Sequence, residues 1–292
     1  MNFRRSKSAI FIFTAVVGGF FLSPKSLAFV GAVSAGTGEA GRAAVEASES
    51  PFGNPASLAF ITGYYFTAGY GSARKTIAGD NQDLAISLTD NMRETVVPTA
   101  LSYVQNNSQL SQGQDDLRRQ IKLSMGNFIT EGVSFGLGVT HTDDRLPYDQ
   151  YAQTNVQTGF LWSPNKDVGF AAVFDNMLKP NESLPKELQV DQTMGFGASY
   201  NYKKFVRFKT DLISNRNNKF DKPTLAAGME SYMNKWLILR WGVQRNYELE
   251  SDLYSGGMGF IGPRFGLHYA YQTSPQDEHL ARHSVDLAVP IW

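Results

Sequence analysis

Residues 236–244, WLILRWGVQ, alternate between apolar and polar side chains along the whole stretch. One set of positions holds Leu237, Leu239, Trp241 and Val243, and the other holds Arg240, Gly242 and Gln244. Successive side chains of a strand point to opposite faces, whereas a helix would repeat every three or four residues. The stretch therefore predicts a strand with one face suited to lipid and one suited to a wet interior.

The same alternation recurs along the chain, for example in VSFGLGVT (133–140), QTMGFGASYNY (192–202) and RFGLHYAYQ (264–272). Each segment has about the length that a tilted strand needs to cross a bilayer, roughly 9–11 residues. We count about 14 such segments, near 60–73, 82–89, 95–104, 117–126, 132–141, 152–162, 167–175, 188–202, 205–213, 223–233, 235–245, 253–262, 264–273 and 282–292.

The connections between these segments alternate in length. RKTIAGDN (74–81) and QNNSQLSQGQDD (105–116) are long, while DNMRE (90–94) and NFITE (127–131) are short. Outer-membrane barrels have short periplasmic turns and longer outward loops. The sequence therefore predicts an all-β fold, a transmembrane antiparallel up-and-down β-barrel of about 14 strands spanning 60–292. An even strand number places both ends of this barrel on the periplasmic side.

The predicted orientation sorts the aromatic residues into two bands, as expected at the two membrane interfaces. Trp162, Tyr200, Tyr202, Trp236 and Trp292 fall near the periplasmic rim, and Tyr70, Tyr103, Tyr254 and Tyr271 near the outer rim.

The last strand is expected to close the barrel, with Val285, Leu287, Val289 and Ile291 on its apolar face. With Trp292 it resembles the C-terminal aromatic signal that the barrel-assembly machinery reads, although Trp292 is one residue out of phase with that face.

Charged residues also occur on the faces that we assign to the lumen, namely Lys122, Arg207, Lys209, Asp211, Glu230 and Arg240. They either pair with one another to keep the interior solvated or shape a polar pathway.

The first 28 residues differ from the rest. Arg4, Arg5 and Lys7 precede an apolar run at 9–22, and small residues follow at Ser26 and Ala28. This pattern predicts a secretory signal peptide over 1–28, because the run is shorter than the roughly 20 residues of a helical span. The chain contains 0 cysteines and has a formal net charge of 0, which gives no electrostatic reason to expect a nucleic-acid partner.

Residues 29–59 do not alternate and are rich in Gly and Ala. EAGRAAVEA (39–47) suits a short helix, and Asn54 followed by Pro55 suits a helix start. Two readings remain open: a periplasmic leader, or a hatch that plugs the barrel. In the hatch, Arg42 and Glu46 would pair with each other or with lumen charges.

The stretch GEAGRAAVEASESPFGNPASLAF (38–60), with its motif Asn54, Pro55 and Ala56, resembles the start of FadL-type and PorV-like outer-membrane proteins. LWSPNKDVGFAAVFDN (161–176) and the closing strand are more similar to the shorter PorV-like branch. The resemblance implies a 14-stranded barrel with an N-terminal hatch. FadL-type members carry hydrophobic molecules and use long outer loops as a first binding site, whereas the loops expected here are short.

Three functions follow from this resemblance and from the residues. The first is a passive channel for small hydrophobic molecules, which we favour. The second is a PorV-like barrel that binds or shuttles secreted proteins, and the third is a structural barrel with a closed lumen. The expected surroundings are outer-membrane lipid and the barrel-assembly machinery.

We expect no enzyme, no catalytic residues, no cofactor and no metal site. His268 is predicted to face inward without a serine partner. His141, Asp143, Asp144, Asp277 and His279 are expected in outer loops, where hydrophilic residues collect.

Overall fold

A computed structural model describes residues 29–75, 79–109, 115–179, 183–185, 188–215 and 220–291. The predicted signal peptide (1–28) and Trp292 lie outside these ranges. Within them, no helix has the length and apolar character needed to cross a membrane.

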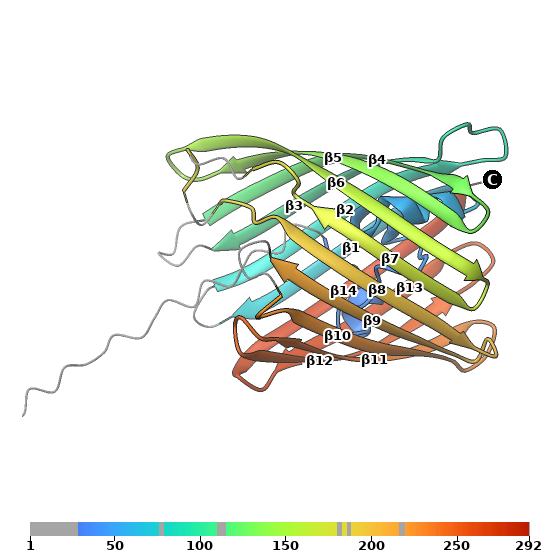
Figure 1. Cartoon of the computed structure of the whole chain (residues 1–292). Coiled ribbons are helices and arrows are strands. Elements are labelled where there is room, and N and C mark those ends of the chain that lie inside the picture. The colour runs from blue at the N-terminus through green and yellow to red at the C-terminus, as the bar shows by residue number, and fades with distance from the viewer. Residues whose placement is uncertain are drawn as a thin grey trace, which may run out of the picture.

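Fourteen strands form one closed barrel in which each strand pairs with its neighbours in the chain (Figure 1). The strands are β1 (Gly63–Lys75), β2 (Gly79–Asn91), β3 (Thr99–Gln109), β4 (Asp115–Thr130), β5 (Val133–Arg145), β6 (Gln150–Asn165), β7 (Val168–Asp175), β8 (Thr193–Tyr202), β9 (Val206–Asn215), β10 (Thr224–Tyr232), β11 (Leu237–Asn246), β12 (Ser251–Ile261), β13 (Gly266–Ser274) and β14 (Asp277–Ile291).

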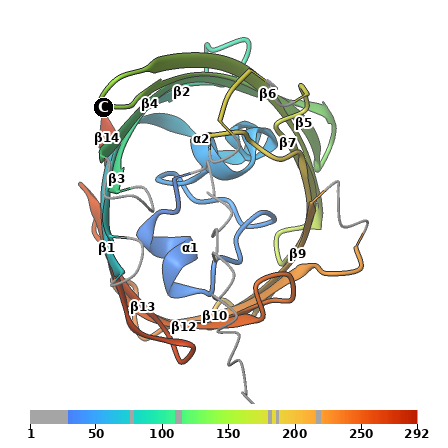
Figure 2. The ribbon, with the colours of Figure 1, turned by 90° about the vertical axis from the view of Figure 1, so that its left-hand side faces the viewer.

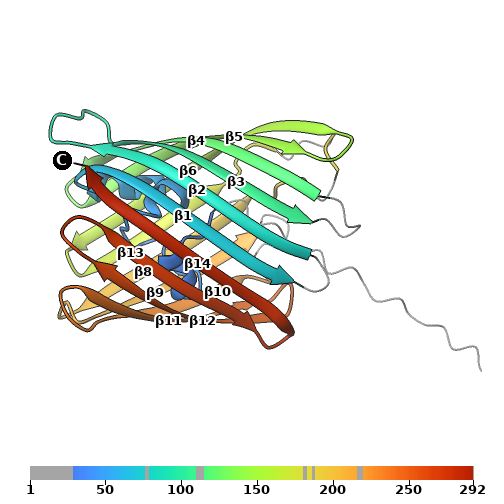
Figure 3. The ribbon, with the colours of Figure 1, turned by 180° about the vertical axis from the view of Figure 1, so that it is seen from behind.

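The barrel closes where the first strand meets the last. β1 and β14 run antiparallel, in register from Tyr64 opposite Ile291 to Arg74 opposite Ala281, and Figure 3 shows them side by side. We call the end of the barrel that holds Ile291 the inner end and the opposite end the outer end. The predicted fold class, an antiparallel transmembrane barrel of 14 strands, is confirmed.

Several strands extend further toward the outer end than predicted. β4, β5 and β6 continue to Asp115, Arg145 and Gln150, and β14 begins at Asp277. The expectation that His141, Asp143, Asp144, Asp277 and His279 lie in loops was therefore wrong. Hairpin pairing satisfies backbone groups above the bilayer as well as within it, so hydrophilic residues continue the ladder there.

The fourth outer connection, between β7 and β8, also differs from its prediction. β7 ends at Asp175, and β8 begins at Thr193 and not near 188. Tyr103, predicted at the outer rim, lies near the middle of β3, where it pairs with Ile86.

Side-chain exposure alternates along the strands as the pairing requires. On β11, Leu237 and Trp241 are 38% and 46% exposed, whereas Arg240 between them is 1% exposed. Apolar side chains thus cover the outside, and charged ones point into the lumen. A slip of one residue would exchange the two faces, so the pairing register specifies the lipid surface.

Residues 29–61 lie inside the barrel, as the view along its axis shows (Figure 2). They form α1 (Ala32–Gly36), α2 (Ser50–Gly53) and the 3₁₀ helix η1 (Pro55–Phe60). The helix expected over 39–47 is absent from this described segment. Gly38 and Glu39 adopt left-handed backbone angles, φ 69° and 67°, which end the helical path before it reaches those residues. We call residues 29–61 the inner segment.

Replacing Leu239 with Arg should destabilise the barrel by about 2 kcal/mol, because it places a charge among lipid-facing side chains. Unfolding by denaturant in a phospholipid bilayer measures this cost. Thr154→Arg is the matched control, since Thr154 is exposed on the outer part of β6. An equal effect at both positions would contradict the assignment of the lipid face.

Candidate functional site

The inner segment rests on rows of glycines in the barrel wall. Gly126, Gly136 and Gly159 are opposite one another on β4, β5 and β6. A Cβ atom at Gly126 or Gly136 would collide with the backbone of Pro55 and Ala56, and one at Gly159 would collide with the Asn54 side chain. We call this row the glycine seat. It lets the backbone of the inner segment approach the backbone of the wall.

Asn54 organises the part of the chain that occupies the glycine seat. Its Oδ1 accepts a hydrogen bond from the Ala56 amide at 3.0 Å, which caps η1, and its Nδ2 donates to the Arg42 carbonyl at 2.9 Å. The Ser134 hydroxyl donates to the Ala56 carbonyl at 2.8 Å. Asn54 therefore joins two turns of the inner segment while Ser134 joins them to the wall.

A second close approach lies across the lumen. Gly228 and Gly242 are paired on β10 and β11, and both lie against the backbone of Thr37, where a Cβ on either would collide. The Gly38 amide donates to the Ser255 hydroxyl on β12 at 2.9 Å. The end of α1 is thus held on the wall opposite the glycine seat.

Wall side chains also satisfy the carbonyls at the end of α2. Lys122 Nζ donates to the Phe52 carbonyl at 2.9 Å and to Gln157 Oε1 at 2.6 Å. The Ser124 hydroxyl donates to the Pro51 carbonyl at 3.1 Å. Helix ends leave carbonyls without intrahelical partners, and these contacts supply them.

Asn91, at the inner end of β2, holds the end of η1. Its Nδ2 lies 3.0 Å from the Leu58 carbonyl and 3.3 Å from that of Ala59, and it also donates to the Ile61 carbonyl. Sequence analysis did not single out Asn91, Gln157 or the three glycines. The only sequence feature that could have indicated these residues was the small and polar character of the lumen-facing positions.

A cluster of buried charges surrounds Glu230 on β10. This carboxylate accepts from Arg240 Nε at 2.8 Å and lies 3.2 Å from both Lys209 Nζ and Arg207 Nη1. Arg207 and Arg240 stand directly opposite Glu230 on β9 and β11. Pairing across three neighbouring strands therefore compensates charges that would be costly to bury alone.

The inner segment is joined to these wall charges by two ion pairs. Glu46 Oε1 lies 2.5 Å from Arg207 Nη1, and Arg42 Nη1 lies 3.0 Å from Asp211 Oδ2. Asp211 also accepts from the Gly41 and Arg42 amides at 3.0 and 3.1 Å. Arg42 and Glu46 therefore pair with lumen charges and not with each other. The backbone between them is not helical.

Two further carboxylates hold the start of α1. Asp286 Oδ2 on β14 accepts from the Ala32 amide at 2.5 Å, and Glu49 Oε1 accepts from the Ser34 amide at 2.7 Å. Burial raises the pKa of the Glu49 carboxyl above its usual range, and the hydrogen bonds from Ser34 oppose that shift. All of these contacts lie within the lumen.

The proposed assembly residues lie on the outside of β14. Val285 and Ile291 are 39% and 44% exposed, and Leu287 and Val289 share their face. Whether this strand with Trp292 is read by the assembly machinery stays a prediction, and Trp292 is outside the described residues.

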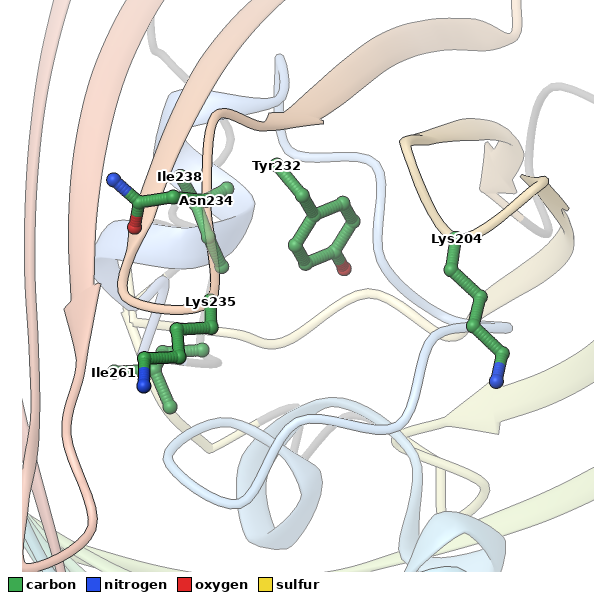
Figure 4. Close-up of a pocket in the computed structure, with 6 residues that line it drawn as sticks. All are labelled: Lys204, Tyr232, Asn234, Lys235, Ile238 and Ile261. Atoms are coloured by element: carbon green, nitrogen blue, oxygen red, sulfur yellow. The ribbon is translucent and has the colours of Figure 1, made fainter.

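A small pocket opens at the inner rim, with a volume of about 290 Å³ (Figure 4). Lys204 comes from the β8–β9 turn and Lys235 from the β10–β11 turn, and the Tyr232 ring stands between them. The Tyr232 hydroxyl is 3.4 Å from Glu230 Oε2, so the pocket borders the buried charge cluster.

The described residues include no group of three or more His, Cys, Asp or Glu side chains that could hold a metal ion. His268 faces inward, where its Nδ1 lies 3.2 Å from Arg240 Nη1. His141 faces outward, with Nδ1 3.0 Å from the Thr154 hydroxyl. Asp144 is buried against Arg118, with Oδ1 and Nε 2.5 Å apart. These three side chains lie apart from one another, and His141 and Asp144 contact the residues directly opposite them on neighbouring strands.

No family model and no curated protein matched the sequence. Several solved structures share the fold. The CymD monoaromatic hydrocarbon channel superposes with a TM-score of 0.70 at 11% identity, over 90% of this chain and 97% of that one. The Ralstonia pickettii toluene transporter TbuX gives 0.68 at 12% identity, over 90% and 98%. A Pseudomonas aeruginosa FadL homologue gives 0.65 at 11% identity, over 90% and 99%. The chain therefore has the architecture of FadL-type barrels.

Gly136→Ala should displace the inner segment from the glycine seat, because the added methyl group meets the backbone of Pro55 and Ala56. Limited proteolysis in detergent should then cleave the inner segment while the strands stay protected. Gly256→Ala is the control, since its Cβ would have only the Arg240 carbonyl nearby, at 4.0 Å. Equal protection in both variants would show that the seat does not hold the segment.

Asn54→Ala should loosen the inner segment by about 1 kcal/mol, the usual contribution of an N-cap side chain. Hydrogen exchange at the Ala56 amide reports the loss directly, because that amide donates to Asn54 Oδ1. Asn54→Asp keeps the acceptor oxygen and should retain most of the protection. A similar loss in both variants would assign the effect to the Arg42 contact instead.

Proposed function

We propose that this protein is a passive outer-membrane channel for small hydrophobic molecules, with residues 29–59 acting as its hatch. In this proposal the chain is exported by its signal peptide, inserted by the barrel-assembly machinery and surrounded by outer-membrane lipid. The solved structures with the same fold include channels named for monoaromatic hydrocarbons and toluene, and this likeness supports a related cargo here.

The observation that carries the proposal is the way the lumen is filled. The inner segment is held to the wall by hydrogen bonds, ion pairs and close backbone contacts. Its buried apolar groups form several small clusters and not one continuous core. Movement of the segment would therefore require the exchange of separate polar contacts and small apolar clusters, and not the disruption of one continuous core, while the barrel stays closed.

The barrel itself does not need the hatch for its strand pairing. All fourteen ladders run between strands, and β1 meets β14 without help from residues 29–59. Movement of the hatch would therefore open a path without disturbing the membrane-facing surface.

Deleting residues 31–50 should leave a folded barrel and raise the permeability of proteoliposomes to small solutes. Heat-modifiable migration on a gel checks the fold, and solute-induced swelling measures the permeability. Asn54→Ala should give a smaller increase. A folded deletion variant with unchanged permeability would favour the structural barrel with a closed lumen.

Uptake of labelled toluene and of a labelled fatty acid by a transporter-deficient host tests the cargo. Uptake above the empty-vector level supports the channel. Unchanged uptake together with a co-purifying secreted protein would replace the proposal by the PorV-like alternative.

A further inference from the structure

The pocket at the inner rim lies on the luminal side of the wall. Its lining residues Tyr232 and Ile238 are paired on β10 and β11, two positions from the pair Glu230 and Arg240, which points into the lumen. Side chains two positions apart on a strand share a face. The pocket is therefore open to solutes at the opening of the lumen at the inner end, which we call the inner mouth, and the wall separates it from the bilayer.

Two ammonium groups of this pocket have no carboxylate partner among the described residues. Lys204 and Lys235 approach it from separate turns, with the Tyr232 ring between them (Figure 4), and neither takes part in an ion pair there. A lysine carries three donors on a flexible four-carbon stem. Both side chains can therefore turn toward an anion in the pocket.

The charges of the inner rim are segregated, and the pocket lies on the basic side. The turns β8–β9, β10–β11 and β12–β13 hold four cations and no carboxylate, namely Lys203, Lys204, Lys235 and Arg264. The other three inner turns each hold a carboxylate, namely Glu94, Glu131 and Asp167. An excess of one charge raises the local concentration of solutes of the opposite charge. Anions are therefore drawn to the side of the inner mouth where the pocket opens.

The β8–β9 turn keeps its lysines against their backbone preference. Lys203 and Lys204 both adopt left-handed angles, φ 50° and 56°. A hairpin turn with two such residues normally uses Asn and Gly, because the left-handed conformation costs other residues about 1–2 kcal/mol each. The turn geometry does not explain two consecutive lysines, whereas a requirement for positive charge at this place does.

The buried charge cluster behind the pocket does not oppose an anion. The Tyr232 hydroxyl lies 3.4 Å from Glu230 Oε2. Glu230 and Glu46, however, are paired with three cations, Arg207, Lys209 and Arg240, so the cluster holds one more cation than carboxylates. The Arg207 guanidinium carbon also lies 5.9 Å from the centre of the Tyr232 ring. Positive charge is thus present behind the ring as well as in front of it.

The rest of the lining suits a small apolar group. Ile238, Ile261 and the Tyr232 ring face the pocket, together with the side chain of Asn234. Its volume of about 290 Å³ is at the lower limit of ligand pockets, roughly 300–1,000 Å³. A single benzene ring with one substituent fits this space, whereas an inorganic ion would leave the apolar side chains uncovered.

We propose that this pocket binds small organic anions, in which a carboxylate is attached to an aromatic ring or a short branched chain. Lys204 and Lys235 bind the carboxylate, and Ile238, Ile261 and Tyr232 contact the apolar part. The inference rests on the proposed channel function in one respect: cargo would leave the lumen at the inner mouth, so the site extends that cargo to small organic acids. Binding itself is measured without transport.

Equilibrium dialysis of the purified protein in detergent tests the site with four labelled probes: benzoate, benzyl alcohol, benzylamine and acetate. Benzoate should bind most tightly, after subtraction of its uptake by empty micelles. Benzyl alcohol lacks the charge, benzylamine carries the opposite charge, and acetate lacks the ring. Raising the salt concentration to about 0.5 M should weaken the binding of benzoate and leave that of benzyl alcohol unchanged, because salt screens exposed charges.

Lys204→Gln and Lys235→Gln should each weaken benzoate binding about threefold, and the double variant about tenfold, as expected for ion pairs open to solvent. Lys203→Gln is the matched control. It removes the same charge from the same turn, but Lys203 Nζ lies 5.1 Å from the centre of the Tyr202 ring and does not line the pocket. Heat-modifiable migration on a gel checks that each variant is folded.

The outcomes separate this site from the channel function. If benzyl alcohol binds as tightly as benzoate, or if Lys203→Gln weakens benzoate binding as much as Lys204→Gln, the anion site is overturned, and the channel is still judged by toluene uptake. Equal binding of acetate and benzoate would overturn the apolar part of the site. If benzoate binds as expected while toluene uptake stays at the vector level, the site stands and the channel function fails.

Discussion

Every backbone amide and carbonyl that enters the hydrocarbon layer must find its partner within the protein, because the bilayer core supplies none. The closed ladder from β1 to β14 meets this requirement and leaves no free edge. Closure also determines where each side chain points. Alternate residues face lipid or lumen, so a strand such as β11 carries Trp241 outside and Arg240 inside within two adjacent positions.

A ring of fourteen strands encloses more space than its own side chains fill. In this protein the N-terminal part of the chain occupies that space, and the wall is adapted to it. Glycines stand opposite one another on β4, β5 and β6, where the backbone of Pro55 and Ala56 approaches. The same wall provides side chains such as Lys122 and Asn91, which bind carbonyls that the short helices leave without partners.

The fold was predictable because strand alternation and strand number are local properties that can be read from each segment. The positions of Arg207, Lys209, Glu230 and Arg240 on one face followed from the same alternation, but their convergence on a single carboxylate depends on the register between strands. The prediction of a helix over 39–47 was wrong. The composition of this stretch favours a helix, but Gly38 and Glu39 adopt left-handed backbone angles that interrupt the helical path. Strand ends were misjudged where polar residues continue the pairing beyond the bilayer. The glycine seat could not be predicted from the sequence, because it depends on the path of the inner segment through the lumen, and no local sequence pattern specifies that path.

The glycine seat has a consequence for the order of events during biogenesis. The inner segment precedes every strand in the chain, yet its seat consists of β4, β5 and β6, and its second contact consists of β10, β11 and β12. The part of the chain that is made first can thus reach its final place only after most of the later part is assembled. Until then the wall side chains that bind its carbonyls are not in place, and its low content of large apolar side chains gives it little reason to collapse on its own. Its many small residues therefore act at two stages. Before the barrel is assembled they limit hydrophobic collapse of the inner segment, and afterwards they allow its backbone to pack against the barrel wall.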